Sequence, residues 1–81
     1  MTHPEAITQA TELAGKMRQF AATEFPSVRA QAKAKDSLGT ELFDFCSNPD
    51  VSNFPDAEYL VIKSILKPVA KETGFDFSVN L

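Results

Sequence analysis

The sequence predicts an all-α fold, a small helical bundle followed by an extended C-terminal tail. Apolar residues recur at intervals of three and four in three separate segments, which is the spacing of one face of a helix. Prolines and clusters of turn-forming residues separate these segments. Only residues 75–81 alternate apolar and polar side chains, the period of an extended chain. With 81 residues in total, we expect a single helical domain, residues 1–81.

The first predicted helix spans about residues 4–24. A wide apolar stripe runs along it, formed by Ile7, Ala10, Ala14, Met17 and Ala21. Pro4 suits the first helical turn, because that turn does not use the N–H group that proline lacks. The helix should end near Phe25, since the ring of Pro26 disfavours helical backbone at the residue before it.

The second predicted helix spans about residues 27–46, with Ser27 as its capping residue. Its weakest stretch is residues 36–39. Gly39 is about 1 kcal/mol less favourable than alanine inside a helix, and aspartate and serine side chains compete for the backbone hydrogen bonds. The alternative is two helices in place of one, which would make a four-helix bundle. Turn-forming residues follow, and we expect a loop over residues 48–54.

The third predicted helix spans about residues 55–73 and begins with Pro55. Its residues are apolar almost all round, apart from a strip of lysines spaced four residues apart, so we expect the central and most buried helix. Pro68 removes the hydrogen bond back to Ser64 and should bend or interrupt the helix. Gly74 should end it, because glycine readily adopts the left-handed conformation of a helix cap.

Composition and charge restrict the function. The chain has 8 Lys and Arg against 11 Asp and Glu, a net charge of −3, which argues against nucleic acid as a partner. No apolar run is long enough to span a membrane, and the first residues lack a secretory pattern, so we expect a cytoplasmic protein. Charge is also segregated, with a net +4 over residues 16–35 and a net −6 over residues 36–62, which could steer association.

The residues that most catalytic and metal sites need are scarce. The chain has one histidine, His3, and one cysteine, Cys46, so neither an intrachain disulfide nor a usual zinc site can form. A glycine-rich phosphate loop is absent, and no nucleophile has a histidine near it in the sequence. We therefore expect no enzyme, no cofactor and no metal ion.

The alternating tail is the strongest candidate for a binding segment. As an extended strand it could pair with the edge of a partner's sheet, or insert its apolar side chains into a partner's pockets. Its candidate partner-binding residues are Phe75, Phe77, Val79 and Leu81. The alternatives are that the tail packs on its own helices or on a second copy of the chain. Residues 79–81 also resemble the apolar C-terminal ligands of PDZ domains.

A second candidate site is Ser37. The string Asp36, Ser37, Leu38 resembles the phosphopantetheine attachment motif of acyl carrier proteins, which are also acidic helical domains of about this length. The resemblance implies a serine near the start of the second helix that carries the prosthetic group. The basic residues that precede Ser37, Lys33 and Lys35 among them, depart from the apolar residues and glycine of the carrier pattern.

These observations favour a binding function over an enzymatic one. The first hypothesis is a small adaptor or inhibitor, bacterial or phage-like in its compactness, that occupies a partner protein's surface through a helix face or the tail. The second is a self-associating accessory protein, a homodimer whose exposed apolar residues are covered by its own copy. The third is a carrier domain modified at Ser37.

Overall fold

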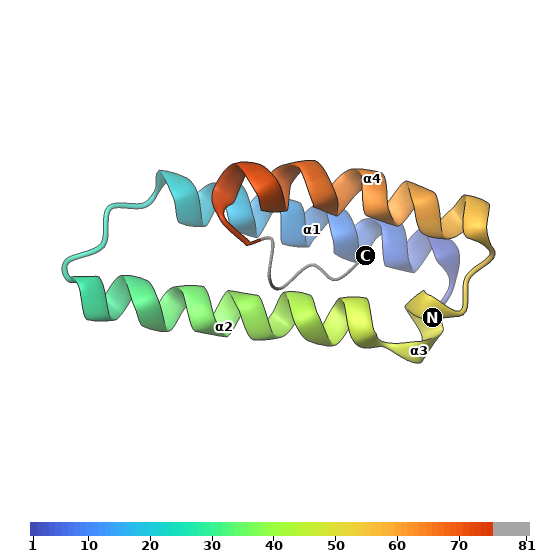
Figure 1. Cartoon of the computed structure of the whole chain (residues 1–81), viewed down its shortest axis with the longest axis horizontal. Coiled ribbons are helices and arrows are strands. Elements are labelled where there is room, and N and C mark those ends of the chain that lie inside the picture. The colour runs from blue at the N-terminus through green and yellow to red at the C-terminus, as the bar shows by residue number, and fades with distance from the viewer. Residues whose placement is uncertain (76–81) are drawn as a thin grey trace.

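The computed structural model of the chain describes residues 1–75. That range contains no strand and is organised as α1 (His3–Ala22), α2 (Val28–Ser47), the single turn α3 (Pro49–Ser52) and α4 (Asp56–Thr73). The three long helices lie side by side in an elongated bundle, with α2 antiparallel to both α1 and α4 (Figure 1). The predicted all-α bundle is confirmed, and its long helices begin and end within two residues of the predicted positions. The rest of the predicted tail, residues 76–81, lies outside the described residues.

Helices α1 and α4 make the most extensive contact in the bundle. The face that α1 buries is rich in alanine, and its members are Ala6, Ala10, Leu13, Ala14 and Met17. Small side chains let two helix axes approach closely, because the distance between packed helices depends on the side chains at the contact. From α4 the core receives larger side chains, including Ile62 and Leu66, both fully buried. The core lies between these two helices and α2, which contributes Leu38, Leu42, Phe45 and Cys46.

Helix α2 is continuous, although the sequence left open a break at residues 36–39. The Ser27 hydroxyl accepts a hydrogen bond from the N–H of Ala30 at 3.1 Å and so caps the first turn. Beyond the weak stretch, Leu38 and Leu42 are buried and anchor the second half of the helix in the core. This packing compensates for the low helix propensity of Gly39, so the bundle has three long helices.

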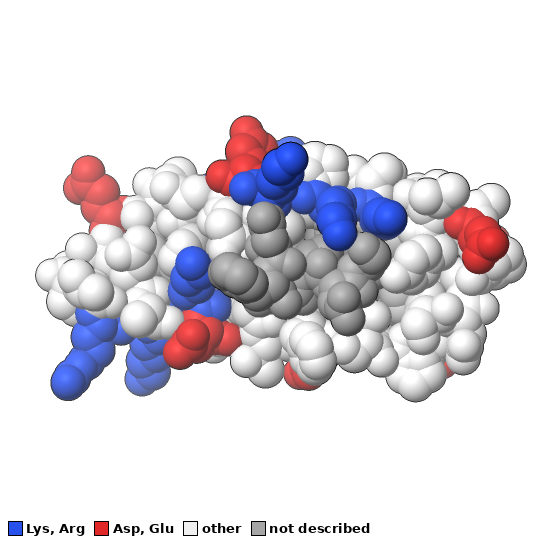
Figure 2. Space-filling view, in the orientation of Figure 1, with Lys and Arg blue, Asp and Glu red and all other residues white. Residues whose placement is uncertain are grey.

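Both signs of charge are distributed along the long axis of the bundle. Because α2 is antiparallel to α1, the first turns of α2 and the last turn of α1 lie towards the same end (Figure 1). Figure 2 shows basic side chains near that end and over the second half of α4, in the middle of the view. Acidic side chains lie beside them and near both ends, so the face shown does not divide into a basic end and an acidic end.

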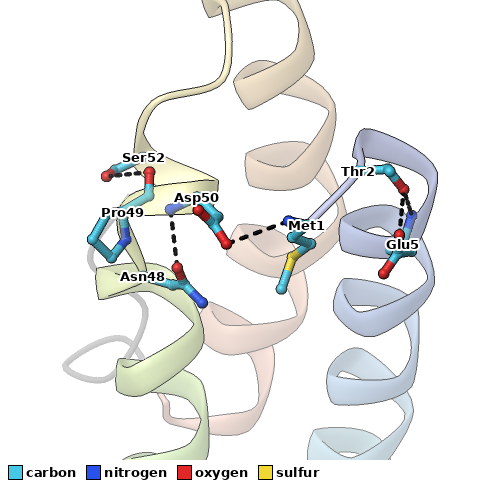
Figure 3. Close-up of polar contacts among 7 residues, drawn as sticks. All are labelled: Met1, Thr2, Glu5, Asn48, Pro49, Asp50 and Ser52. Atoms are coloured by element: carbon cyan, nitrogen blue, oxygen red, sulfur yellow. Dashed lines mark hydrogen bonds and ion pairs between the residues drawn. The ribbon is translucent and has the colours of Figure 1, made fainter.

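The predicted loop over residues 48–54 is wrong at its centre, which forms the helical turn α3. The Asn48 side chain accepts a hydrogen bond from the N–H of Asp50 at 2.9 Å, and Pro49 supplies a backbone angle suited to a first turn (Figure 3). Val51 is fully buried and holds the turn against the core. The carboxylate of Asp50 also pairs with the Met1 amino group at 3.3 Å.

Helix α4 continues through Pro68 to Thr73, so the predicted interruption does not occur. Pro68 and Ser64 both lie on the exposed side of the helix, where water can hydrate the Ser64 carbonyl that has lost its intrahelical donor. Gly74 ends the helix as predicted. Its φ of 84° is left-handed, and its N–H donates to the carbonyl of Ala70.

His3 connects the start of α1 to the start of α4. Its Nε2 lies 3.1 Å from the backbone oxygen of Glu58, so that nitrogen carries the hydrogen and donates. The ring also packs edge-on against Phe54, with 5.5 Å between the ring centres. Replacing this side chain removes one long-range hydrogen bond and one aromatic contact.

We expect His3→Ala to lower the free energy of unfolding by about 1–2 kcal/mol, measured by urea denaturation. Thr11→Ala is the matched control, because the exposed Thr11 hydroxyl donates only to the carbonyl of Ile7 in its own helix. This control should change stability by less than about 0.5 kcal/mol. Equal effects of the two substitutions would show that His3 does not hold the helices together.

Candidate protein-binding surface

Phe75, the first of the predicted docking residues, lies in the core and is only 1% exposed. The left-handed turn at Gly74 redirects the chain, and the N–H of Phe75 donates to the carbonyl of Ala70 at 2.8 Å. Its ring packs edge-on against Phe20, and the Lys35 ammonium lies 5.9 Å from the ring centre. The prediction of an accessible docking side chain is therefore wrong for Phe75.

The other tail candidates, Phe77, Val79 and Leu81, lie outside the described residues. Ser37 is described, and it is an exposed residue in the middle of α2, nine positions after the first residue of that helix. The carrier resemblance implied a serine near the start of a helix. The structure therefore does not supply the position that the resemblance implied for Ser37.

The polar side chains and grooves of residues 1–75 are the next candidates for a site. Within residues 1–75, no three His, Cys, Asp or Glu side chains are grouped so that they could hold a metal ion. Cys46 is buried. A groove of about 300 Å³ lies between α1 and α2, and its acidic side chains are Glu12, Glu41 and Asp44. Lys16 partly neutralises this groove through its ion pair with Glu41 at 2.6 Å.

The clearest candidate for a binding surface is one side of α4. Leu60 is 59% exposed and its neighbour Val61 is 41% exposed, so two large apolar side chains of α4 are left uncovered by the bundle. Residues three and four apart lie next to each other on a helix, so these two share one surface with exposed residues of the adjacent turns. We call this surface the outer face of α4, and its exposed residues are Ala57, Leu60, Val61, Ser64, Lys67 and Pro68.

Charged residues border this surface at both ends. Asp56 is the first residue of α4, and the last turn holds Lys71 and Glu72, all three with exposed side chains. Asp56 and Lys71 each lie near the end of the helix dipole that stabilises them. Figure 2 shows basic side chains over the second half of α4 with acidic atoms beside them. A partner on this surface would therefore meet an acidic residue at one end and both signs of charge at the other.

The two polar groups of Ser64, in the middle of the surface, differ in their hydrogen bonding. The Ser64 hydroxyl donates to the carbonyl of Val61 at 2.7 Å, within the same helix. An apolar partner could therefore cover the hydroxyl without leaving its hydrogen unpaired. The Ser64 carbonyl, which Pro68 leaves without an intrahelical donor, would lose its water if such a partner covered it.

Sequence reasoning missed this surface because it treated α4 as a buried helix. The apolar residues of α4 cover more than one side of a helix, but the sequence does not say which side the other helices leave uncovered. The sequence signal that could have revealed this surface was the number of apolar residues on α4, which is larger than one buried side of a helix can hold. A three-helix bundle buries one side of each helix, so an almost wholly apolar helix should leave some apolar residues exposed.

No family model, no curated protein and no solved structure matches the chain. Within residues 1–75, none of the helices combines the length and the hydropathy that crossing a bilayer requires.

Proposed function

We propose that this chain is a small, non-enzymatic protein-binding module, an adaptor or an inhibitor, that acts through the outer face of α4. The observation that carries the proposal is the exposure of Leu60 and Val61, two consecutive residues on the uncovered side of α4. An amphipathic helix can bind a partner protein by placing apolar side chains of one face in a hydrophobic groove. The cytoplasmic location expected from the sequence is part of the same proposal.

The packing beneath this surface supports the proposal. Ile62 and Leu66, on the opposite side of α4, are fully buried, so the helix that presents Leu60 and Val61 is held in place by the core. A surface that is already ordered loses little conformational entropy when a partner binds. Val28 is more exposed, at 83%, but its neighbours Ser27 and Arg29 are polar. The outer face of α4 is therefore preferred over Val28 as an anchor site.

The tail remains a second route to a partner within the same proposal. Phe77, Val79 and Leu81 keep the alternation that first suggested docking, whereas Phe75 belongs to the core. A chain that ends at Phe75 retains the core residue and removes only the candidate docking residues. Truncation at this position is consequently the appropriate test of the tail.

Self-association is the second candidate function, and one observation favours it. The outer face of α4 has Asp56 at one end and Lys71 at the other, so a second copy packed antiparallel could bring these two oppositely charged residues together. In that case the chain would be an accessory protein that works as a homodimer. The carrier hypothesis has no comparable support, because Ser37 lies in the middle of a helix.

Site-specific photo-cross-linking tests the proposed function. A benzophenone amino acid at position 60 of the full chain should yield a discrete protein adduct in a lysate of cells that naturally express it. The same group at the exposed Gln19 on α1 is the matched control and should yield none. Unlabelled chain should compete for the adduct, and a variant with Leu60→Glu and Val61→Glu should compete at least about tenfold less well. Equal labelling from both positions, or none from position 60, would contradict the proposal.

A further inference from the structure

We infer that a groove between α2 and the end of α4 binds residues 76–81 of the same chain. The inference goes beyond the proposed function, because it concerns a different surface and does not use the outer face of α4. The groove has a volume of about 640 Å³. Its lining residues come from α2 and from the end of α4, and they are Lys35, Asp36, Gly39, Thr40, Phe43, Gly74 and Phe75.

The described part of the chain ends at this groove. The left-handed turn at Gly74 ends α4, and the N–H of Phe75 donates to the carbonyl of Ala70 at 2.8 Å. Phe75 is itself part of the groove wall, so the following residue is one peptide bond from a fixed position beside the groove. A segment tethered so closely has an effective concentration in roughly the millimolar range for a neighbouring site. A free partner of the same chemistry would need a comparable concentration to compete.

The alternation of residues 75–81 agrees with the burial of Phe75. In an extended chain, every second side chain points to the same side. Phe77, Val79 and Leu81 follow Phe75 at intervals of two, and Phe75 is only 1% exposed. An extended continuation from Phe75 therefore directs the apolar side chains of the segment towards the bundle and its polar side chains towards water.

The dimensions of the groove suit a segment of this length. Its wall on α2 runs from Lys35 to Phe43, which is eight residues or about 12 Å along the helix axis. Six extended residues span about 20 Å, enough to follow this wall from end to end. Phe43 is 50% exposed and offers an apolar contact to the segment. Gly39, between the two ends of the wall, presents no side chain that would obstruct it.

The charges around the groove also permit this occupant. Lys35 and Asp36 are the charged residues of the lining, and the last turn of α4 adds Lys71 and Glu72, again one charge of each sign. Residues 76–81 contain a single charged side chain, Asp76. The Lys35 ammonium lies 5.9 Å from the centre of the Phe75 ring, near the point where the chain continues into Asp76, so opposite charges meet at the entrance of the groove.

In this arrangement the tail is an internal ligand of the bundle. A partner that uses Phe77, Val79 or Leu81 must first displace the tail from the groove. Its apparent affinity is then reduced by the fraction of chains whose tail is free. The outer face of α4 does not take part, so binding through that face is independent of the tail.

Intramolecular photo-cross-linking tests the inference. A benzophenone amino acid that replaces Phe43 in the purified full chain should form an adduct of one chain mass, and peptide mapping should place its second end within residues 76–81. The same group at Ser37, an exposed residue of α2 outside the groove, is the matched control and should not reach that segment. An adduct of twice the chain mass would assign the groove to a second copy and overturn the inference. Equal yields from both positions, or no adduct from position 43, would overturn it as well.

Two substitutions test which side of the segment faces the groove. Val79→Asp places a carboxylate among apolar side chains and should lower the cross-link yield from position 43 about tenfold. Ser78→Asp adds the same charge on the side that faces water, so the yield should stay within about twofold of the wild-type value. Both variants keep Phe75, and circular dichroism should show native helix content for each. Equal losses of yield from both substitutions would overturn the proposed binding of the apolar side chains.

Discussion

Phe75→Ala should lower the free energy of unfolding by about 3–5 kcal/mol, the range seen when a large buried aromatic side chain is removed from a core. Phe75 is 1% exposed and packs against Phe20 near the end of α1 and Lys35 of α2, so its removal leaves a cavity in the core beside the end of α4. A small domain has roughly 5–15 kcal/mol of total stability. Much of that would be lost, and urea denaturation followed by circular dichroism measures the loss.

Phe43→Ala is the matched control for this prediction, because Phe43 is 50% exposed on α2. It should change the free energy of unfolding by less than about 1 kcal/mol. If both substitutions destabilise the chain equally, Phe75 is not a core residue. A chain that ends at Phe75 should keep most of the stability, whereas one that ends at Gly74 should behave like Phe75→Ala.

Leu66→Ala should lower the free energy of unfolding by about 2–5 kcal/mol. Leu66 is fully buried on the side of α4 that packs in the core. The alanine-rich face of α1 makes this part of the core closely packed. Such surroundings relax little around a deleted side chain, which is why the cavity remains. The midpoint of urea denaturation measures the change.

Leu60→Ala provides the control within the same helix and for the same residue type. Leu60 is 59% exposed, so the substitution should change stability by less than about 0.5 kcal/mol while weakening association through the outer face of α4. The two substitutions therefore distinguish the two sides of α4. The buried side stabilises the fold, and the exposed side is available to a partner. Equal destabilisation by both substitutions would contradict this division.

The local elements could be predicted because they depend on local chemistry. Ser27 caps a helix through its own hydroxyl, and Gly74 ends one because it tolerates a positive φ. The one missed element, α3, is a single turn whose signals are the same as those of a loop: a capping asparagine, a proline and an aspartate. Only the burial of Val51 distinguishes the two, and burial depends on the rest of the fold.

The candidate site could not be predicted in the same way. An alternating segment such as residues 75–81 has the same pattern whether its apolar side chains reach a partner or their own core, and Phe75 is in the core. Likewise, Leu60 and Leu66 are the same residue type in one apolar helix, yet one is exposed and the other is buried. Their roles depend on which side of α4 faces α1.

By itself, the sequence determined the all-α class, the three long helices and nearly all of their boundaries, because periodicity, capping residues and prolines act within a few residues of the chain. Tertiary structure alone decided that α2 continues through Gly39, that Phe75 is buried, and that Leu60 and Val61 are left exposed. The physical reason is the same in each case. Burial depends on how helices distant in sequence pack against one another, and no local pattern contains that information.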